Sequence, residues 1–281
     1  MPYMLFSSKF RHSNPSRIDF WRDKLDNSQM PVLFLGHGSP MNAIEDNEFS
    51  LAWREAASEI PQPKAILCIS AHWETRGSQV TAMETPRTIH DFYGFPRPLF
   101  EKQYPAPGSP DLAAKVIKLV SRSTVQPDQS WGLDHGTWSV LSQMYPQALV
   151  PIVQLSLDRS HENANHYQLG RELRQLRQEG VLIIGSGNIV HNLRMMVWED
   201  TAFDWAVEYD TKVTQWILEG DHEAIIHYEK HGQAAILSVN SAEHYLPLLY
   251  ILGLREQNEP VSFFADKIWG GSISMRCVRF G

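Results

Sequence analysis

Residues 31–40 read PVLFLGHGSP, an apolar run over 31–35 that is followed at once by small residues around His37. A nearly continuous apolar run of this length is typical of a strand covered on both faces, as in a parallel sheet under helices. The glycines that follow give the backbone room to approach a ligand. We therefore expect a buried strand that ends in a turn carrying His37.

The same arrangement occurs twice more along the chain. Residues 65–69 (AILCI) run into a short segment with His72, and residues 181–184 (VLII) run into a segment with His191. Three predicted strands thus each lead into small residues and a histidine. In open α/β sheets the ligand crevice lies at the carboxyl ends of the strands, so three imidazoles can converge there.

The wider pattern predicts one α/β domain. A fourth apolar run, 150–155, contains Pro151 and is expected near a sheet edge or a strand start. Helical patterns are expected over residues 110–120, 161–179, 203–218 and 246–252. Strands that alternate with helices favour a single domain with a central, mainly parallel or mixed sheet flanked by helices.

Composition excludes several classes of protein. The chain has 281 residues with a formal net charge of -7 at pH 7, which argues against nucleic acid or an anionic membrane as the main partner. No apolar run approaches the length of a membrane-spanning helix. Two cysteines, Cys68 and Cys277, make neither a disulfide framework nor a Cys-rich zinc site. A cytoplasmic protein is the natural interpretation.

Further histidines stand in unusual surroundings. His135 lies between glycines and tryptophans, His244 precedes an apolar helix, and His90 lies in an aromatic-rich segment. Five others occupy polar, helix-like stretches and are expected at the solvated surface: His161, His166, His222, His227 and His231. Imidazole suits zinc, iron, copper and nickel. Three histidines with an open position suit a catalytic zinc or an Fe(II) centre, and the residues alone do not choose.

Seven ordered motifs carry a family resemblance. They read LFLGHGSPMN, SAHWET, AMETPRTIHDFYGFP, YPAPGSP, WGLDHGTWSVL, SGNIVHNLR and EHYLPLLYILG. With these motifs the chain resembles the DOPA 4,5-dioxygenase branch of the class III extradiol ring-cleavage dioxygenases. The resemblance implies an α/β fold, one divalent metal per subunit, and cleavage of a catechol ring beside its hydroxyls by O₂.

The resemblance also implies a set of metal ligands. It makes His37 and His72 ligands and places His244 in the third ligand region, where Glu243 is the alternative. His191 matches a histidine that is a further ligand in parts of the family and an acid/base in others. Fe(II) is expected for activity, and an all-histidine site can also hold Zn(II) in a purified sample.

Roles toward the substrate follow from the same motifs. We expect His191 to be the acid/base, and His135 of the DHG motif to face the substrate and assist proton transfer. Trp73 and Tyr93 lie near the motif histidines and can stack on a flat ring, although core packing is their commoner role. With His90 they complete the predicted substrate-binding residues.

The resemblance runs from about Pro31 to the C-terminus. Residues 1–29 precede it and lack the apolar stretch and cleavage site of a signal peptide. We expect them to form a poorly ordered N-terminal extension, and residues 30–281 to form the catalytic domain.

Two other functions compete with ring cleavage. A zinc-dependent hydrolase or lyase could use the same histidines and would need no O₂. A non-catalytic protein of the same fold could bind metal or ligand without turnover. The intact ligand, DHG and IVHN motifs favour the dioxygenase, with DOPA or caffeate as candidate catechols, and an oligomer is compatible with the sequence.

Overall fold

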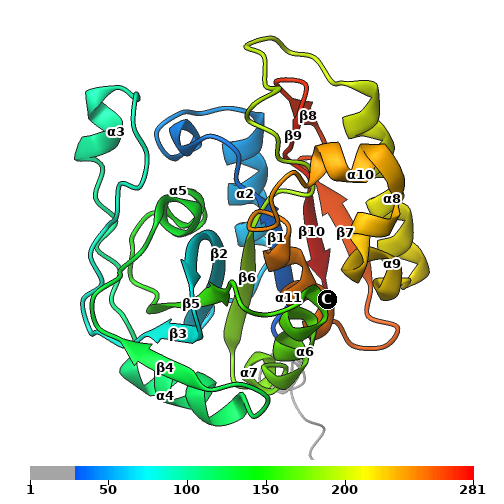
Figure 1. Ribbon diagram of the computed structural model, residues 1–281. Coiled ribbons are helices and arrows are strands. Elements are labelled where there is room, and N and C mark those ends of the chain that lie inside the picture. The colour runs from blue at the N-terminus through cyan, green and yellow to red at the C-terminus, as the bar shows by residue number, and fades with distance from the viewer. Residues whose placement is uncertain (1–28) are drawn as a thin grey trace, which may run out of the picture.

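A computed structural model describes residues 29–281 of the protein (Figure 1). The extension predicted for residues 1–29 therefore lies outside the described residues, apart from Gln29, whose side-chain amide donates to Glu256 Oε1 at 3.1 Å. No helix between residues 29 and 281 combines the length and the apolar character needed to cross a membrane.

An eight-stranded sheet in the order β4-β3-β5-β2-β6-β1-β10-β7 forms the centre of the molecule. A separate two-stranded sheet pairs β8 with β9. The strands are β1 (Val32–Gly36), β2 (Ala65–Thr75), β3 (Ser78–Thr81), β4 (Val125–Asp128), β5 (Ile152–Asp158), β6 (Val181–Gly187), β7 (Val261–Phe264), β8 (Ile268–Trp269), β9 (Ile273–Ser274) and β10 (Cys277–Phe280).

The four middle strands, β5, β2, β6 and β1, run parallel, whereas β10 and β7 continue the sheet antiparallel at one end. The prediction of a single α/β domain with a mixed sheet is thus confirmed. All four apolar runs form strands. The edge position considered for the fourth run is wrong, because β5 is interior; Pro151 directly precedes its first residue, where a missing N–H removes no ladder bond.

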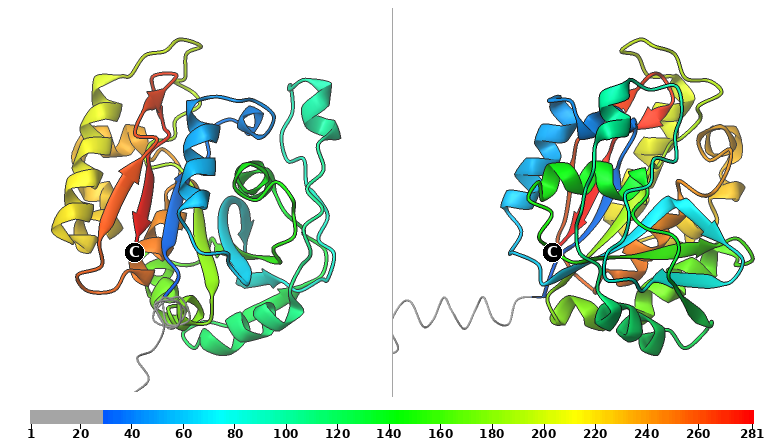
Figure 2. Two further views of the ribbon diagram at one scale, coloured as in Figure 1. Left: turned by 180° about the vertical axis from the view of Figure 1, so that it is seen from behind. Right: turned by 90° about the vertical axis from the view of Figure 1, so that its left-hand side faces the viewer.

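Helices cover both faces of the sheet (Figure 2). One face carries α2 (Glu48–Ser58), α3 (Arg97–Glu101) and α5 (His135–Met144). The other face carries α4 (Pro110–Leu119), α6 (Asn163–Glu172), α7 (Gln175–Gln178), α8 (Asp204–Glu219), α9 (His222–Ile226), α10 (Gly232–Ser238) and α11 (Leu246–Leu254). Short 3-10 turns are η1 (Pro40–Ala43) and η2 (Tyr228–Lys230).

Alternation along β1 explains how both faces are filled. Val32 and Phe34 enter the core on the α11 side, while Leu33 and Leu35 enter the core on the α5 side. Side chains on successive residues of a strand point to opposite faces, so a strand buried on both sides has no polar position. The continuous apolar run was therefore a sound signal for this strand.

Two predictions about the 161–179 region are wrong. The expected single helix is broken, because α6 ends at Glu172 and α7 begins at Gln175. His166 is not at the surface: its ring is fully buried on α6, and Nδ1 lies 3.1 Å from the hydroxyl of Tyr250 on α11. A polar sequence around a residue does not show which side of the helix packs inward.

Candidate metal centre

The carboxyl ends of β1 and β6 place His37. These strands pair in parallel register, with Gly36 opposite Gly187, and the His37 amide donates to the Gly187 carbonyl at 3.1 Å. His72 comes from β2, the next strand on the other side of β6. It lies within β2, where the register shifts, and not in a turn after it as expected.

Gly187, at the end of β6, has no side chain and therefore lets the segment with His244 come close to this strand. A Cβ on Gly187 would lie 2.1 Å from the His244 carbonyl oxygen, so any larger residue would push this segment away. The Asn188 amide donates to that same carbonyl at 2.8 Å. The segment before α11 is thereby held against the end of β6.

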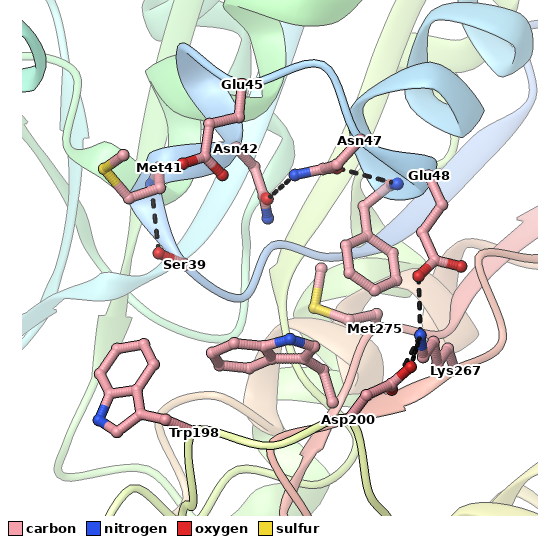
Figure 3. Close-up of a pocket in the computed structure, with 12 residues that line it drawn as sticks. Ser39, Met41, Asn42, Glu45, Asn47, Glu48, Trp198, Asp200, Lys267 and Met275 are labelled. Atoms are coloured by element: carbon pink, nitrogen blue, oxygen red, sulfur yellow. Dashed lines mark hydrogen bonds and ion pairs between the residues drawn. The ribbon is translucent and has the colours of Figure 1, made fainter.

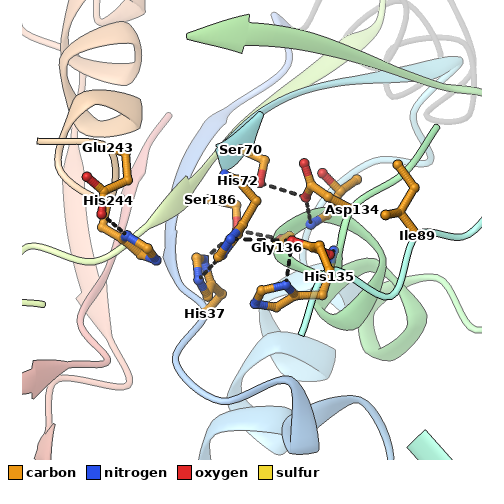
Figure 4. Close-up of polar contacts among 12 residues, drawn as sticks. His37, Ser70, His72, Ile89, Asp134, His135, Gly136, Ser186, Glu243 and His244 are labelled. Carbon is orange, nitrogen blue, oxygen red and sulfur yellow. Dashed lines mark hydrogen bonds and ion pairs between the residues drawn. The ribbon is translucent and has the colours of Figure 1, made fainter. Parts of the chain in front are cut away.

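Three imidazoles meet at this point (Figure 4). One ligand nitrogen from each of His37, His72 and His244 lies within 4.8 Å of the other two. The Nε2 atoms of His37 and His72 are 3.1 Å apart. Two nitrogens bound about 2.0–2.1 Å from one ion, with an N–metal–N angle between 90° (octahedral) and 109° (tetrahedral), would be about 2.8–3.4 Å apart. The observed separation fits a shared metal.

Hydrogen bonds decide which nitrogen of each ring is free. Ser186 Oγ donates its proton to the Gly136 carbonyl at 2.5 Å, so at 3.0 Å it accepts from His37 Nδ1–H. His244 Nδ1 lies 3.0 Å from the Glu243 carboxylate, which accepts. In both rings the proton is thus on Nδ1, and Nε2 keeps the lone pair that a metal needs.

His72 is arranged in the same way. Its Nδ1 faces the Asp91 carboxylate at 3.4 Å, and its Nε2 points at His37. Two nitrogen lone pairs that face each other repel unless a cation lies between them. Glu243, the alternative third ligand, instead supports His244 through Nδ1. The donor set therefore fits a divalent metal on three imidazoles.

Burial keeps these imidazoles neutral. It lowers the pKa of His37 and of His244 well below the usual range, and the neighbouring imidazoles lower both further. Burial likewise lowers the pKa of His72, with His135 as the next cause. Neutral imidazole is the form that binds metal, so the site needs no deprotonation at neutral pH.

His191 lies beside this group rather than within it. Its ring stacks on that of His244, with ring centroids 3.5 Å apart and an interplanar angle of 9°. One nitrogen of His191 lies within 4.8 Å of possible ligand atoms of Glu243 and His244, whereas His191 does not belong to the group formed by His37, His72 and His244. Burial lowers the pKa of His191 to about 4.

His135, the first residue of α5, is held by Asp91. The Asp91 carboxylate accepts from His135 Nδ1–H and from its backbone amide, both at 2.9 Å. Burial opposes ionisation of Asp91, but these hydrogen bonds outweigh it and its pKa is lowered. The His135 ring centroid lies 3.8 Å from that of His72. Asp134, which caps α5 through the Thr137 amide, fixes the helix start.

The histidines border a cavity of about 380 Å³, called the reactive cavity below. His37, His72, His135, His191 and His244 all line it. Aromatic side chains complete the wall and include Phe92, Tyr93, Phe95, Trp198 and Trp269. Its size and its flat apolar walls suit a single aromatic ring.

The predicted substrate-binding residues divide into two groups. His135 and Tyr93 line the reactive cavity, and Tyr93 is 91% exposed at its rim. His90 and Trp73 do not border it. His90 Nε2 pairs with the Lys102 carbonyl at 2.9 Å, and Trp73 is buried against Trp131 with ring centroids 5.5 Å apart. Their role in substrate binding stays a prediction.

Some site residues were missed from the sequence. Ser186 sits inside a strand motif as one of several small residues, and nothing local marks it as the partner of His37. Trp198 had a usable signal, because it is a large aromatic in a polar segment soon after His191. Trp198 is part of the site because it lines the reactive cavity, although 80% of its surface is exposed.

Comparisons with known proteins show the family to which the chain belongs. Residues 30–269 match the family model of the catalytic LigB subunit of aromatic ring-opening dioxygenase. A protein of Escherichia coli (strain K12) named 4,5-DOPA dioxygenase extradiol is 45% identical over 92% of this chain and 97% of its own length. A Beta vulgaris protein of the same name is 37% identical over 89% of this chain and 96% of its own length.

A solved structure has the same fold. The crystal structure of an uncharacterized protein from Escherichia coli K12 superimposes with a TM-score of 0.77 and 40% identity, covering 90% of this chain and 100% of that one. The family match covers the strand ends and the histidines described above. The chain belongs to the LigB family of aromatic ring-opening dioxygenases, which are oxidoreductases.

Proposed function

We propose that this enzyme opens the ring of a DOPA-like catechol with O₂ at one divalent metal held by His37, His72 and His244. The observation that carries the proposal is the convergence of three Nε2 lone pairs on the wall of a cavity that fits one aromatic ring. The names of the Escherichia coli and Beta vulgaris relatives support a DOPA-like substrate. The proposed catalytic unit spans residues 30–281.

Fe(II) is the proposed working metal, because Zn(II) has no redox chemistry to offer to O₂. When bound, it would supply coordination positions for the catechol oxygens and O₂ and the electron transfer between them. The free and buried thiols of Cys68 and Cys277 suit a reducing compartment, and we place the enzyme in the cytoplasm.

His135 is the proposed base for a catechol hydroxyl. Its Nδ1 proton is held by Asp91, so its Nε2 is free to accept the substrate proton. The Asp91 carboxylate then stabilises the imidazolium that forms, as carboxylates do for catalytic histidines. The structure thus supports a larger role for His135 than orienting the substrate.

His191 is the proposed second proton carrier. It borders the same cavity, and its ring packs flat on that of His244. A neutral imidazole in this place can take a proton from the reacting ring and return it later. Tyr93 and Leu193 lie at the exposed rim of the same cavity.

Oxygen consumption tests the proposal directly. Protein loaded with Fe(II) under nitrogen is mixed with DOPA in air, and O₂ uptake and the absorbance of the ring-opened product are followed together. We expect one O₂ per DOPA, with loss of activity and of bound metal in His37→Ala and His72→Ala. His227→Ala, which alters a part-exposed histidine just after α9, should keep both.

Two results would refute the proposed ring cleavage. Protein that holds one Fe(II) per chain and yet consumes no O₂ with a panel of catechols is not an extradiol dioxygenase. An activity that persists without O₂ and follows bound Zn(II) would favour a hydrolase at the same histidines.

A further inference from the structure

A second cavity of about 490 Å³ lies beside the reactive cavity (Figure 3). We call it the outer chamber. The two cavities share Ser39, Trp198 and Trp269 as wall residues. Ser39 follows His37 by two residues and caps η1. A molecule whose ring lies at the histidines can therefore place a substituent in the outer chamber without leaving the site.

The charges in the outer chamber are unequal. Glu45, Glu48 and Asp200 line it together with a single cation, Lys267. Lys267 Nζ lies 2.9 Å from Glu48 Oε1 and 2.9 Å from an oxygen of Asp200. Two of the three carboxylates thus share the one ammonium, and the chamber carries an excess of two negative charges. Glu45 forms no ion pair with any of residues 29–281.

Tryptophan faces add to this preference for positive charge. Trp198 is 80% exposed, and its ring meets Trp269 edge to face with centroids 5.7 Å apart. An indole this exposed gains little from burial, yet it stands on the boundary between the two cavities. The face of an indole attracts an ammonium group, by about 0.5–1 kcal/mol at exposed sites.

We propose that the outer chamber binds the ring substituent of the catechol and selects substituents that carry an ammonium group over those that carry a carboxylate. The inference rests on the proposed ring-opening function and adds a binding subsite to it. Among catechols, amines and amino acids are then preferred to acids of the caffeate type. Glu45 is the main specificity residue, because its charge is not shared with Lys267.

Three catechols whose ring substituents differ in charge test the preference. Dopamine carries an ammonium, 3,4-dihydroxyphenylpropionate a carboxylate and 4-methylcatechol no charge. We expect kcat/KM of the Fe(II) enzyme to be highest for dopamine and lowest for the acid. Glu45→Gln should reduce the dopamine-to-acid ratio about two- to fivefold, the range for one exposed ion pair, and leave 4-methylcatechol unchanged.

A matched variant controls for net charge. Glu55→Gln removes the same charge from an exposed residue of α2 that does not line the chamber, and the ratio should stay at the wild-type value. An unchanged ratio in both Glu45→Gln and the double variant Glu45→Gln/Asp200→Asn, with 4-methylcatechol still cleaved, overturns the inference and leaves the proposed function standing.

Binding without turnover separates the two proposals. If neither DOPA nor any of the three catechols is cleaved, the proposed function fails, and calorimetry on metal-free protein still tests the chamber. Tyramine should then bind more tightly than 3-(4-hydroxyphenyl)propionate, and Glu45→Gln should narrow the difference about two- to fivefold. Equal affinities in the wild-type protein would overturn the inference.

Discussion

Gly136, the second residue of α5, lies against two residues that build the site. A Cβ there would be 2.5 Å from Ser70 Oγ and 2.9 Å from His72 Cδ2. Because Gly136 has no side chain, α5 can approach β2. The Gly136 carbonyl also accepts the hydrogen bond of the Ser186 hydroxyl, so the Ser186 oxygen can accept a hydrogen bond from His37. One glycine therefore bears on two metal-binding rings.

We predict that Gly136→Ala weakens metal binding about 10–100-fold, the usual cost of disturbing groups that orient metal ligands. The methyl group forces His72 or the start of α5 to move. Competition with a chromophoric chelator gives the Zn(II) affinity, and far-UV circular dichroism checks the fold. Ser139→Ala removes a buried hydroxyl that has no partner within residues 29–281, and should bind Zn(II) as wild type does. If Gly136→Ala bound Zn(II) as tightly as Ser139→Ala and the wild-type protein do, the prediction would be refuted.

His166 couples stability to pH. Burial lowers its pKa to about 4 in the folded protein, against about 6.5 when unfolded. Because the unfolded chain binds the proton first, this stability is complete above pH 6.5 and is lost as pH falls toward 4. Its share of the loss between pH 7 and pH 5 is about 2 kcal/mol.

His166→Gln should remove the part of the acid-induced loss in the free energy of unfolding that comes from this ring. Urea unfolding at pH 7 and pH 5 gives the difference in free energy, so any constant cost of the substitution cancels. We expect the difference to shrink by about 2 kcal/mol relative to wild type. In Ser139→Ala, which removes no titratable group, the difference should stay as in wild type. An unchanged difference in His166→Gln would show that this ring is not titrating.

Among the elements, α7 is tied to the sheet by a buried guanidinium. Arg177 is fully buried, donates to the Met30 and Leu254 carbonyls at 2.8 and 2.9 Å, and pairs with Glu259. The entry to β1, the end of α7 and the chain after α11 thus meet at one side chain.

Glu259→Gln leaves this buried charge without its partner. We expect a loss of about 3–5 kcal/mol in the free energy of unfolding, measured in urea. Glu101→Gln breaks the exposed Arg97–Glu101 pair within α3 and should cost less than about 0.5 kcal/mol. Similar losses for the two variants would contradict the burial argument.

The elements that the sequence predicted are those with a strong local signal. β1 and β6 are uniformly buried and therefore continuously apolar. β4 and β7 were not predicted, because edge strands of four residues such as these carry mixed residues. α5 was not predicted as a helix, and its residues Gly136 and Thr137 are weak helix formers. Its Asp134 cap and complete burial override propensity.

For the whole molecule, a metal that bridges β1, β2 and the start of α11 should stabilise the native fold. Zinc at about one hundred times its dissociation constant would add about 2.7 kcal/mol, which raises Tm by about 5–10 °C in a chain of this size. Calorimetry with Zn(II) and then with a chelator measures the shift. His37→Ala should show no shift, and His227→Ala should keep it. A Zn(II)-dependent shift that survives in His37→Ala would place the ion elsewhere.

The sequence predicted the histidines but not the shape of the site. Each histidine carries a local motif, so His37, His72 and His244 could be singled out one at a time. The outer chamber has no motif, because Glu45, Asp200 and Lys267 come from three distant segments and meet only in the fold. The contacts of His90 and Trp73 could not be predicted for the same reason: nearness in sequence does not show which way a side chain points.

The position of β1 between β6 and β10 has a consequence for biosynthesis. Among the strands of residues 29–281, β1 is synthesised first and β10 last, more than 200 residues later. At about 5–20 residues per second, the nascent chain carries an unpaired apolar strand for on the order of ten seconds or more. We therefore expect chaperones that bind unfolded nascent chains to bind residues 31–35 preferentially. His37 follows β1 directly, so we expect the metal to bind only after β1 has paired with β6 and β10.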